Sequence, residues 1–212
     1  MEALIAPATL AVAYFSVPLC LRVTLRAIQP LGRLIYTSWK TRCSRPHLRP
    51  MPAPDFSPTP ASILTIRFQD CDPFNHLNNG RYTDYFLNAR EDQLLEHYGL
   101  DIYRIARETG ACWVVSTSQI AYLRPAITME KVLIETMLIS LAPKHVAVEM
   151  RMWDAGHRAL KAFCWMGFVH FDLRTNTVKE HSAEYMELFA RIHQPVAEKS
   201  FEERLAALKR GA

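Results

Sequence analysis

The run that begins at Asp70 carries the side chains of this sequence best suited to acyl chemistry. Asp70 and Asp72 are alternating carboxylates, and His76, Asn78 and Asn79 follow where an amphipathic helix begins. The first N–H groups of a helix have no intrahelical partner and carry partial positive charge, so they can stabilise the oxyanion that forms from an acyl carbonyl. A carboxylate beside them can attack the carbonyl or deprotonate water. The run therefore predicts acyl-transfer chemistry.

Asp72 is our candidate for the catalytic carboxylate, and a purely structural role is the alternative. Because Pro73 follows it, Asp72 could instead cap a turn with its side chain. We expect Asp70 to serve structure, either by hydrogen bonding to the loop or by pairing with Arg67. His76 has two open roles: it could polarise water or the carbonyl, or it could fix the turn.

The remaining residues of the run have simpler expected roles. Asn78 suits the N-cap of the helix, and Asn79 would act mainly through its backbone N–H. We expect Tyr82 to be a core residue of the helix. Cys71 is disfavoured as a nucleophile, because strand alternation points it away from the two carboxylates. A metal site made of these carboxylates and the imidazole is also disfavoured, since no further ligand cluster is evident.

One long helix is expected directly after this run, over residues 79–98. Its apolar positions follow the helical period i, i+3, i+4 and i+7. They are Tyr82, Tyr85, Phe86 and Ala89, and Leu94, Leu95 and Tyr98 continue the face. Asn78 provides the start and Gly99 the stop. An aromatic face of this length predicts a helix packed against a sheet.

The other predicted elements are mostly strands. Alternating or continuous apolar patterns predict strands at 62–70, 111–124, 131–141, 145–153 and 158–173. Helices are expected at 101–109, 182–192 and 198–210. Because no helices separate the last four strands, hairpins must connect them and the sheet must be antiparallel. The predicted class is α+β.

This order of elements, together with the polar run, resembles the hotdog fold, in which a curved antiparallel sheet wraps one long central helix. The resemblance covers about residues 61–175. Asp70-Cys-Asp72-Pro is similar to the start of the 4-hydroxybenzoyl-CoA thioesterase family. The pattern H-x-N-N-x-x-Y, from His76 to Tyr82, resembles acyl-CoA and acyl-carrier-protein thioesterases.

The resemblance implies a thioester hydrolase that needs no cofactor. It implies that Asp72 is the catalytic nucleophile or general base, that the Asn79 N–H is the oxyanion donor and that His76 assists. In plant acyl-carrier-protein thioesterases an Asn stands two residues after the corresponding Asp, where this sequence has Phe74. The Asp-centred mechanism is therefore favoured over the plant-type relay.

Substrate contacts and partners are also implied by the resemblance. Asn78, Tyr82, Thr117 and Ser118 are the expected substrate-binding residues, the last two because related enzymes often place a polar residue of the second strand toward the site. The expected partner is an acyl-CoA or acyl-carrier-protein substrate. Related proteins build their sites between subunits, so a homodimer or homotetramer is expected; the exposed edges of a small sheet agree with this.

Three basic residues, Arg124, Lys144 and Arg158, could meet the phosphates of coenzyme A, although surface charges of this kind are common. The alternative function is a non-catalytic acyl-CoA-binding or membrane-associated hotdog protein. A hydratase is less favoured, because its His/carboxylate arrangement is not found here.

Composition agrees with a globular domain that carries an extension. The 212 residues are 50% hydrophobic and 22% charged, with a net charge of +4. Residues 1–60 hold seven Lys/Arg against two acids, so the rest is nearly neutral and does not suggest a nucleic-acid surface. The five widely spaced cysteines form no C-x-x-C and indicate reduced thiols in a cytosol-like compartment.

The N-terminal extension has three open interpretations. Residues 3–21 contain no charge and precede a basic stretch, which suits a membrane anchor. The Arg-rich, acid-poor composition also suits an organellar transit segment. The third possibility is a mis-assigned start, with the native chain beginning at Met51. We expect an extension with a Pro-rich linker at 1–60, a hotdog domain at 61–175 and a helical tail at 176–212, in a cytoplasmic protein that is membrane-anchored or organellar if the extension is native.

Overall fold

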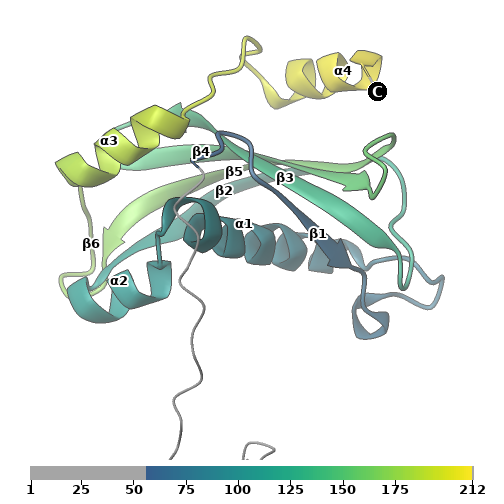
Figure 1. Ribbon diagram of the computed structural model, residues 1–212, viewed down its shortest axis with the longest axis horizontal. Coiled ribbons are helices and arrows are strands. Elements are labelled where there is room, and N and C mark those ends of the chain that lie inside the picture. Colours follow the sequence, from purple (N-terminus) through teal and green to yellow (C-terminus); the bar gives the residue numbers. More distant parts are fainter. Residues whose placement is uncertain (1–55, 212) are drawn as a thin grey trace, which may run out of the picture. The chain divides into compact units, whose positions relative to one another are not determined.

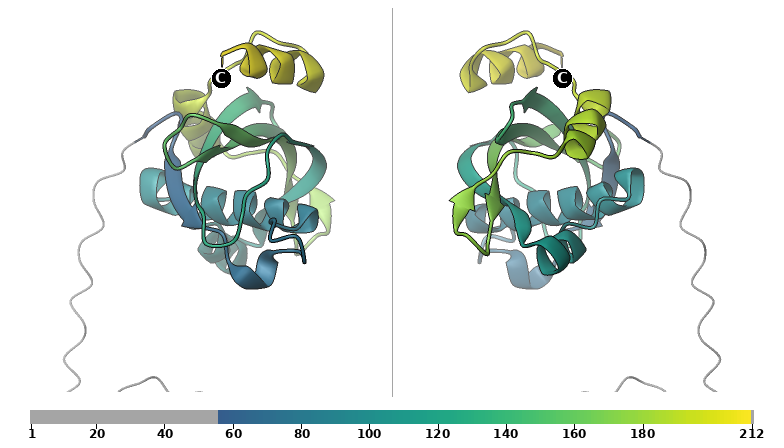
Figure 2. Two further views of the ribbon diagram at one scale, coloured as in Figure 1. Left: turned by 90° about the vertical axis from the view of Figure 1, so that its right-hand side faces the viewer. Right: turned by 90° about the vertical axis from the view of Figure 1, so that its left-hand side faces the viewer.

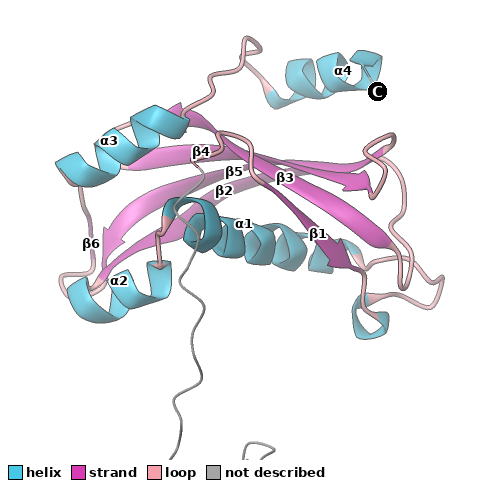
Figure 3. Cartoon of the chain, in the orientation of Figure 1, coloured by secondary structure: helices cyan, strands magenta, loops and turns pink. Residues whose placement is uncertain are grey.

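The computed structural model describes residues 56–211, and a curved antiparallel sheet around one helix dominates it (Figure 1). The strands are β1 (Ala61–Thr65), β2 (Ala111–Tyr122), β3 (Lys131–Leu141), β4 (His145–Asp154), β5 (Leu160–Asp172) and β6 (Thr177–Val178). The helices are α1 (Tyr82–Tyr98), α2 (Ile102–Thr109), α3 (Ala183–Ile192) and α4 (Phe201–Gly211), with short 3-10 turns η1 (Phe68–Asp70) and η2 (Asn79–Arg81). Figure 3 shows that helices and strands occupy separate layers.

The sheet has the order β1-β3-β4-β5-β2, with β6 beside β5, and every pairing is antiparallel. This confirms the predicted α+β class. Figure 2 shows the strands curving over α1. Strand β2 forms one edge of the sheet, and its register against β5 shifts between Val115 and Thr117.

Helix α1 lies on the concave face of the sheet because one side of it is apolar. The four predicted positions Tyr82, Tyr85, Phe86 and Ala89 are all buried. Leu95 is an exception, since 38% of it is exposed. Asn78 caps η2, which leads into α1, and Gly99 ends α1 in the left-handed conformation with φ 68°.

A second, smaller core lies on the opposite face of the sheet. On β4 and β5, side chains of alternating positions reach the two faces, and Trp153, Leu160 and Phe163 pack with Phe201 of α4 on the outer one. Figure 1 shows α4 across the sheet from α1. Phe189 and Ile192 of α3 instead belong to the main core, which is the larger cluster that contains the buried face of α1.

The predicted strand at 62–70 is too long, because β1 ends at Thr65 and η1 follows. Thr65 pairs with Lys131, the first residue of β3, so no strand continues opposite Phe68. The backbone turns instead, with Asp70 N–H donating to Arg67 and Cys71 N–H to Phe68. The two-residue β6 was not predicted. The other predicted helices and strands are present within three residues of their expected ends.

No helix in the described part is long and apolar enough to span a bilayer. The uncharged stretch 3–21, the basic stretch after it and Met51 lie outside the described residues.

Candidate active site

A tight loop ahead of α1 holds the Asp72 carboxylate. Its Oδ1 accepts hydrogen bonds from the backbone N–H groups of Phe74 (2.9 Å) and His76 (3.1 Å), and the Asp72 N–H donates to the His76 carbonyl (2.8 Å). Within residues 56–211, Oδ2 has no hydrogen-bond partner. The carboxylate therefore caps the turn, as the structural alternative predicted, with one oxygen only.

The start of the helix presents a backbone donor. Asn78 Oδ1 accepts the N–H of Gly80 (3.0 Å), which is the cap predicted for it. The Asn79 N–H donates to no acceptor in the described part of the chain, as expected for the first residue of a helical turn. The Asn79 carbonyl, by contrast, accepts a hydrogen bond from Tyr122 Oη (3.1 Å). The Asn78 cap and the Tyr122 hydrogen bond therefore flank the Asn79 peptide unit. Its N–H, the predicted oxyanion donor, has no acceptor within residues 56–211.

One groove of about 260 Å³ brings the three predicted catalytic residues together. It is lined by Asp72, His76, Leu77, Asn79, Tyr82, Tyr122, Leu123, Arg124 and Pro125. These residues come from the loop, from the helix start and from the end of β2 with the segment after it. The groove therefore joins a carboxylate, an imidazole, the first residue of a helical turn and a cation that lie up to 52 positions apart in the sequence.

Tyr82 contributes the wall of this groove. It is only 2% exposed, its Oη accepts the N–H of Ala126 (3.2 Å), and its ring meets the Tyr122 ring edge-on at 5.0 Å. Burial raises the pKa of Tyr82, partly offset by the Ala126 hydrogen bond. Tyr82 is thus the core residue that was expected, and it also borders the groove.

Tyr122 was not predicted as a site residue. Its hydrogen bond to Asn79 spans 43 positions in the sequence. Nothing in its local pattern distinguishes it from any aromatic residue at the end of a strand.

Asp70 has a structural role, although not with the expected partner. Its Oδ2 accepts a hydrogen bond from Tyr85 Oη (2.9 Å), which in turn accepts the N–H of Arg67 (2.8 Å). The cation near Asp70 is Arg81, at 3.8 Å, so the predicted pairing with the Arg67 side chain is wrong. Burial raises the pKa of Tyr85, and Asp70 raises it further. This chain of contacts fixes the loop to α1.

Thr117 and Ser118 do not line the groove of their own chain. They lie on the exposed part of the edge strand β2, opposite Gly167 and Met166 of β5. Asn78 does not line the groove either.

The other predicted cations and the thiol are engaged elsewhere. Lys144 pairs with Glu180 (3.7 Å), and Arg158 pairs with Asp154 (3.6 Å). The Cys71 thiol donates to the Arg67 carbonyl (3.4 Å) and packs against the main core. Within residues 56–211, no three His, Cys, Asp or Glu side chains gather as metal ligands do.

The comparisons with known proteins agree with the predicted fold. The family model of the thioesterase-like superfamily matches residues 66–201. No curated protein matches the chain. Among solved structures, YbaW from Escherichia coli, described as a probable thioesterase, is 23% identical with a TM-score of 0.54, over 63% of this chain and 98% of that one.

Two structures of enzymes with a named substrate are also similar. A 1,4-dihydroxy-2-naphthoyl-CoA thioesterase from Synechocystis is 13% identical with a TM-score of 0.57, over 62% of this chain and 96% of that one. The DHNA-CoA thioesterase from Staphylococcus aureus is 13% identical with a TM-score of 0.58, over 73% and 95%. At these identities the likeness shows the fold, which is the predicted hotdog fold. Since the family model covers most of the chain, the protein belongs to the thioesterase-like superfamily.

Proposed function

We propose that this protein hydrolyses acyl-CoA thioesters to the free acid and coenzyme A, with Asp72 as the catalytic carboxylate. The observation that carries the proposal is that Asp72 and Asn79, whose N–H has no acceptor within residues 56–211, line the same groove. Family membership supports a thioester hydrolase, and two of the similar structures are described as CoA thioesterases. An acyl-carrier-protein thioester is a related candidate substrate, and the thiol-release assay includes it.

In the proposed reaction, the thioester carbonyl lies between Asp72 and Asn79. Charge that develops on the carbonyl oxygen is stabilised by the Asn79 N–H, which carries the partial positive charge of a helix start. Asp72 either attacks the carbonyl carbon or removes a proton from the attacking water. In the first route the C–S bond breaks as the thiolate leaves, and water then hydrolyses the mixed anhydride on Asp72. In the second route water forms the new C–O bond, and the C–S bond breaks when the thiolate leaves. The thiolate takes up a proton in both routes, so both yield the acid and the thiol. His76, whose side chain is exposed beside the groove, assists by polarising water or the carbonyl.

The groove also suggests how a CoA group would approach. Arg124 lines it and forms no ion pair within the described residues, whereas Lys144 and Arg158 are paired. We therefore propose Arg124 as the phosphate contact.

Replacing Asp72 tests the proposal, because two substitutions separate chemistry from turn capping. Asp72→Asn keeps an oxygen that can accept the Phe74 and His76 N–H groups, but it removes the negative charge. We expect thiol release from short, medium, long and aromatic acyl-CoAs to fall at least a hundredfold, with unchanged melting temperature. Asp72→Ala should abolish activity and also lower stability by about 1 kcal/mol, since it removes the cap.

The matched control is Asp92→Asn, which removes an exposed carboxylate from α1 and should keep full activity. Hydrolysis by Asp72→Asn at the wild-type rate would reject Asp72 as the catalyst. If the wild-type protein binds acyl-CoA but releases no thiol from any substrate, including acyl-carrier-protein, the non-catalytic alternative is correct.

We also propose that two copies associate through β2. The outer edge of this strand pairs with no other strand of the described residues, and Val114 and Val115 are 46% and 40% exposed there. A two-fold pairing of β2 strands would continue the sheet and cover this edge. It would also bring Thr117 and Ser118 to the subunit interface, where they would be placed to contribute to a site between the subunits.

A further inference from the structure

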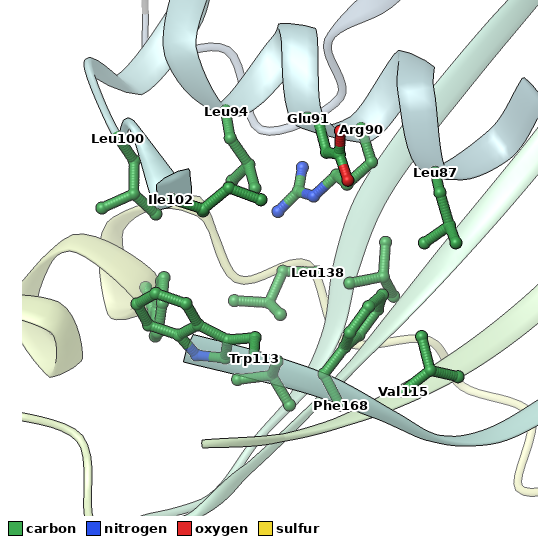
Figure 4. A pocket seen from close by; sticks show the side chains of 13 residues that line it. Leu87, Arg90, Glu91, Leu94, Leu100, Ile102, Trp113, Val115, Leu138 and Phe168 are labelled. Atoms are coloured by element: carbon green, nitrogen blue, oxygen red, sulfur yellow. The ribbon is translucent and has the colours of Figure 1, made fainter. Parts of the chain in front are cut away.

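A second cavity lies between the C-terminal half of α1 and the sheet (Figure 4). Its volume is about 200 Å³, and apolar side chains make up most of its wall. Leu87, Leu94, Leu138, Val148, Trp113 and Phe168 represent the helix and the strands that enclose it. It shares no lining residue with the Asp72 groove. Because a helix rises about 1.5 Å per residue, it lies roughly 16 Å along the helix from Asn79.

The positively charged side chain of Arg90 is buried at this cavity. Arg90 lines it and is only 6% exposed, and Figure 4 shows its guanidinium among the apolar side chains. Its contacts are a hydrogen bond from Nη1 to Thr136 Oγ1 (3.0 Å) and a position over the Tyr98 ring, 5.7 Å from the centroid. In residues 56–211 it forms no ion pair with a carboxylate. A guanidinium has five N–H donors, so these contacts leave most of them available.

Burial of this kind is costly without an anion. Desolvation lowers the pKa of Arg90, and only Tyr98 opposes that effect. Arginine nevertheless stays charged in proteins. A buried charge that lacks an opposite charge gains most from an anionic ligand that enters the same low-dielectric space.

Glu91 does not supply that anion. It also lines the cavity, but it forms no ion pair with Arg90, and its carboxylate accepts a hydrogen bond from Tyr103 Oη on α2. Glu91 and Tyr103 also line a neighbouring surface groove together with Asp84 and Tyr85.

We propose that this cavity is a binding site for a carboxylate with an apolar body, and that Arg90 pairs with the carboxylate. The apolar walls match an aliphatic or aromatic body. A cavity of about 150 Å³ with similar walls can hold benzene, so this one suits a ring or a chain of medium length. Arginine matches a carboxylate because its fork can donate two parallel hydrogen bonds.

The carboxylate has two possible sources. It is either a free carboxylic acid, such as a hydrolysis product, or the distal carboxylate of an acyl group whose thioester lies elsewhere. The second source rests on the thioester hydrolysis proposed above, whereas the first does not.

Binding of octanoate and octan-1-ol to the full chain tests the proposal directly. The two probes have the same chain length and differ in the charged group. Isothermal titration calorimetry should give an affinity for octanoate at least tenfold above that for octanol. Quenching of Trp113, which lines the cavity, should report the same affinity. Arg90→Met keeps an unbranched apolar side chain and leaves Thr136 bonded to Gln93 Oε1 (2.6 Å), so we expect it to fold and to reverse the preference.

The matched control is Arg107→Met, which replaces an exposed arginine of α2 and should bind octanoate as the wild type does. The proposal is overturned if the wild type prefers octanol, or if Arg90→Met keeps the octanoate affinity. The wild-type comparison needs no variant, so it decides even if Arg90→Met does not fold.

Two further measurements distinguish a free acid from the distal carboxylate of an acyl group. If the distal end of an acyl group occupies the cavity, Arg90→Met should lower kcat/KM at least tenfold for a mono-CoA thioester of octanedioic acid but not for octanoyl-CoA. If a free acid occupies it, both thioesters should be affected alike. Asp72→Asn should bind octanoate normally, so loss of hydrolysis and loss of this site remain distinguishable.

Discussion

At the scale of single residues, the proposed chemistry depends on the direction of one N–H group. The Asn79 peptide is held by its position after the Asn78 cap and by the hydrogen bond from Tyr122 to its carbonyl. The N–H of Asn79 can face a substrate only if that peptide unit keeps its orientation. Tyr122 is therefore a positioning residue, although it does not touch the reacting atoms.

We predict that Tyr122→Phe lowers kcat/KM for acyl-CoA hydrolysis by roughly fivefold, because one hydrogen bond is worth about 1 kcal/mol. The ring remains, so its packing on Tyr82 and the melting temperature should change little. Tyr103→Phe removes an exposed hydroxyl from α2 and serves as the control in the same thiol-release assay. Equal kcat/KM for wild type and Tyr122→Phe would show that the hydrogen bond from Tyr122 to the Asn79 carbonyl does not position the Asn79 N–H for hydrolysis.

At the scale of elements, two buried histidines connect α3 and its leading segment to the sheet. The His170 and His181 rings stack at 4.8 Å, His170 Nδ1 lies 3.1 Å from the Glu180 carbonyl, and Trp113 Nε1 donates to His181 Nε2 (3.1 Å). Desolvation lowers the pKa of both histidines, and His170 lowers that of His181 further. Both rings are therefore neutral in the folded protein at pH 7.

This pair predicts that stability falls as the solution becomes acidic. A histidine whose pKa is lowered by folding stabilises the protein fully above its unfolded value of 6.5, and this contribution is lost as the pH falls toward the folded value. Melting temperature between pH 8 and pH 5 should therefore decrease below pH 6.5. His170→Phe should weaken the decrease, whereas His157→Gln, at an exposed position, should not. Identical pH profiles for His170→Phe and wild type would contradict this account.

At the scale of the whole described fold, α4 is joined to the outer face of the sheet by a buried ion pair. Arg204 Nε and Nη2 donate to the two oxygens of Glu149, at 2.9 and 3.1 Å, and Glu149 is fully buried. Trp165 Nε1 also donates to Glu149 (2.9 Å), and Arg151 lies 3.4 Å away. A buried carboxylate that loses a partner destabilises a protein strongly.

We therefore predict that Arg204→Met lowers the free energy of unfolding by roughly 2–3 kcal/mol, somewhat less than for a fully isolated pair because Arg151 and Trp165 remain. The double variant Glu149→Gln/Arg204→Met should recover part of this loss, since no uncompensated charge stays buried. Urea denaturation measures both values. A double variant that is less stable than Arg204→Met would mean that the pair does not act as a unit.

The proposed dimer is the second prediction at this scale. Val114→Lys places a charge on the exposed edge of β2, where lysine opposes strand pairing between copies. Light scattering after size-exclusion chromatography should show a dimer for the wild type and a monomer for Val114→Lys. Leu173→Lys, which replaces another exposed apolar residue beyond the end of β5, should stay dimeric. A monomeric wild-type protein would refute the proposal.

The sequence by itself determined the class and the order of elements, because each depends on neighbours along the chain. Helical spacing from Tyr82 to Ala89 identified the face of α1, and hairpin connections required an antiparallel sheet. The same holds for Asp72, Asn78 and Asn79, which lie within eight positions, so that local turns and a cap bring them together.

Only the tertiary structure decided the contacts that join distant segments. Tyr122 meets Asn79, Arg81 rather than Arg67 lies near Asp70, and Arg90 reaches a cavity whose walls come from four strands and three helices. The curvature of the sheet sets these distances, and curvature leaves no pattern in any short stretch of sequence. The end of β1 at Thr65 was likewise decided by the start of its partner at Lys131, because a strand extends only as far as a neighbour can accept its hydrogen bonds.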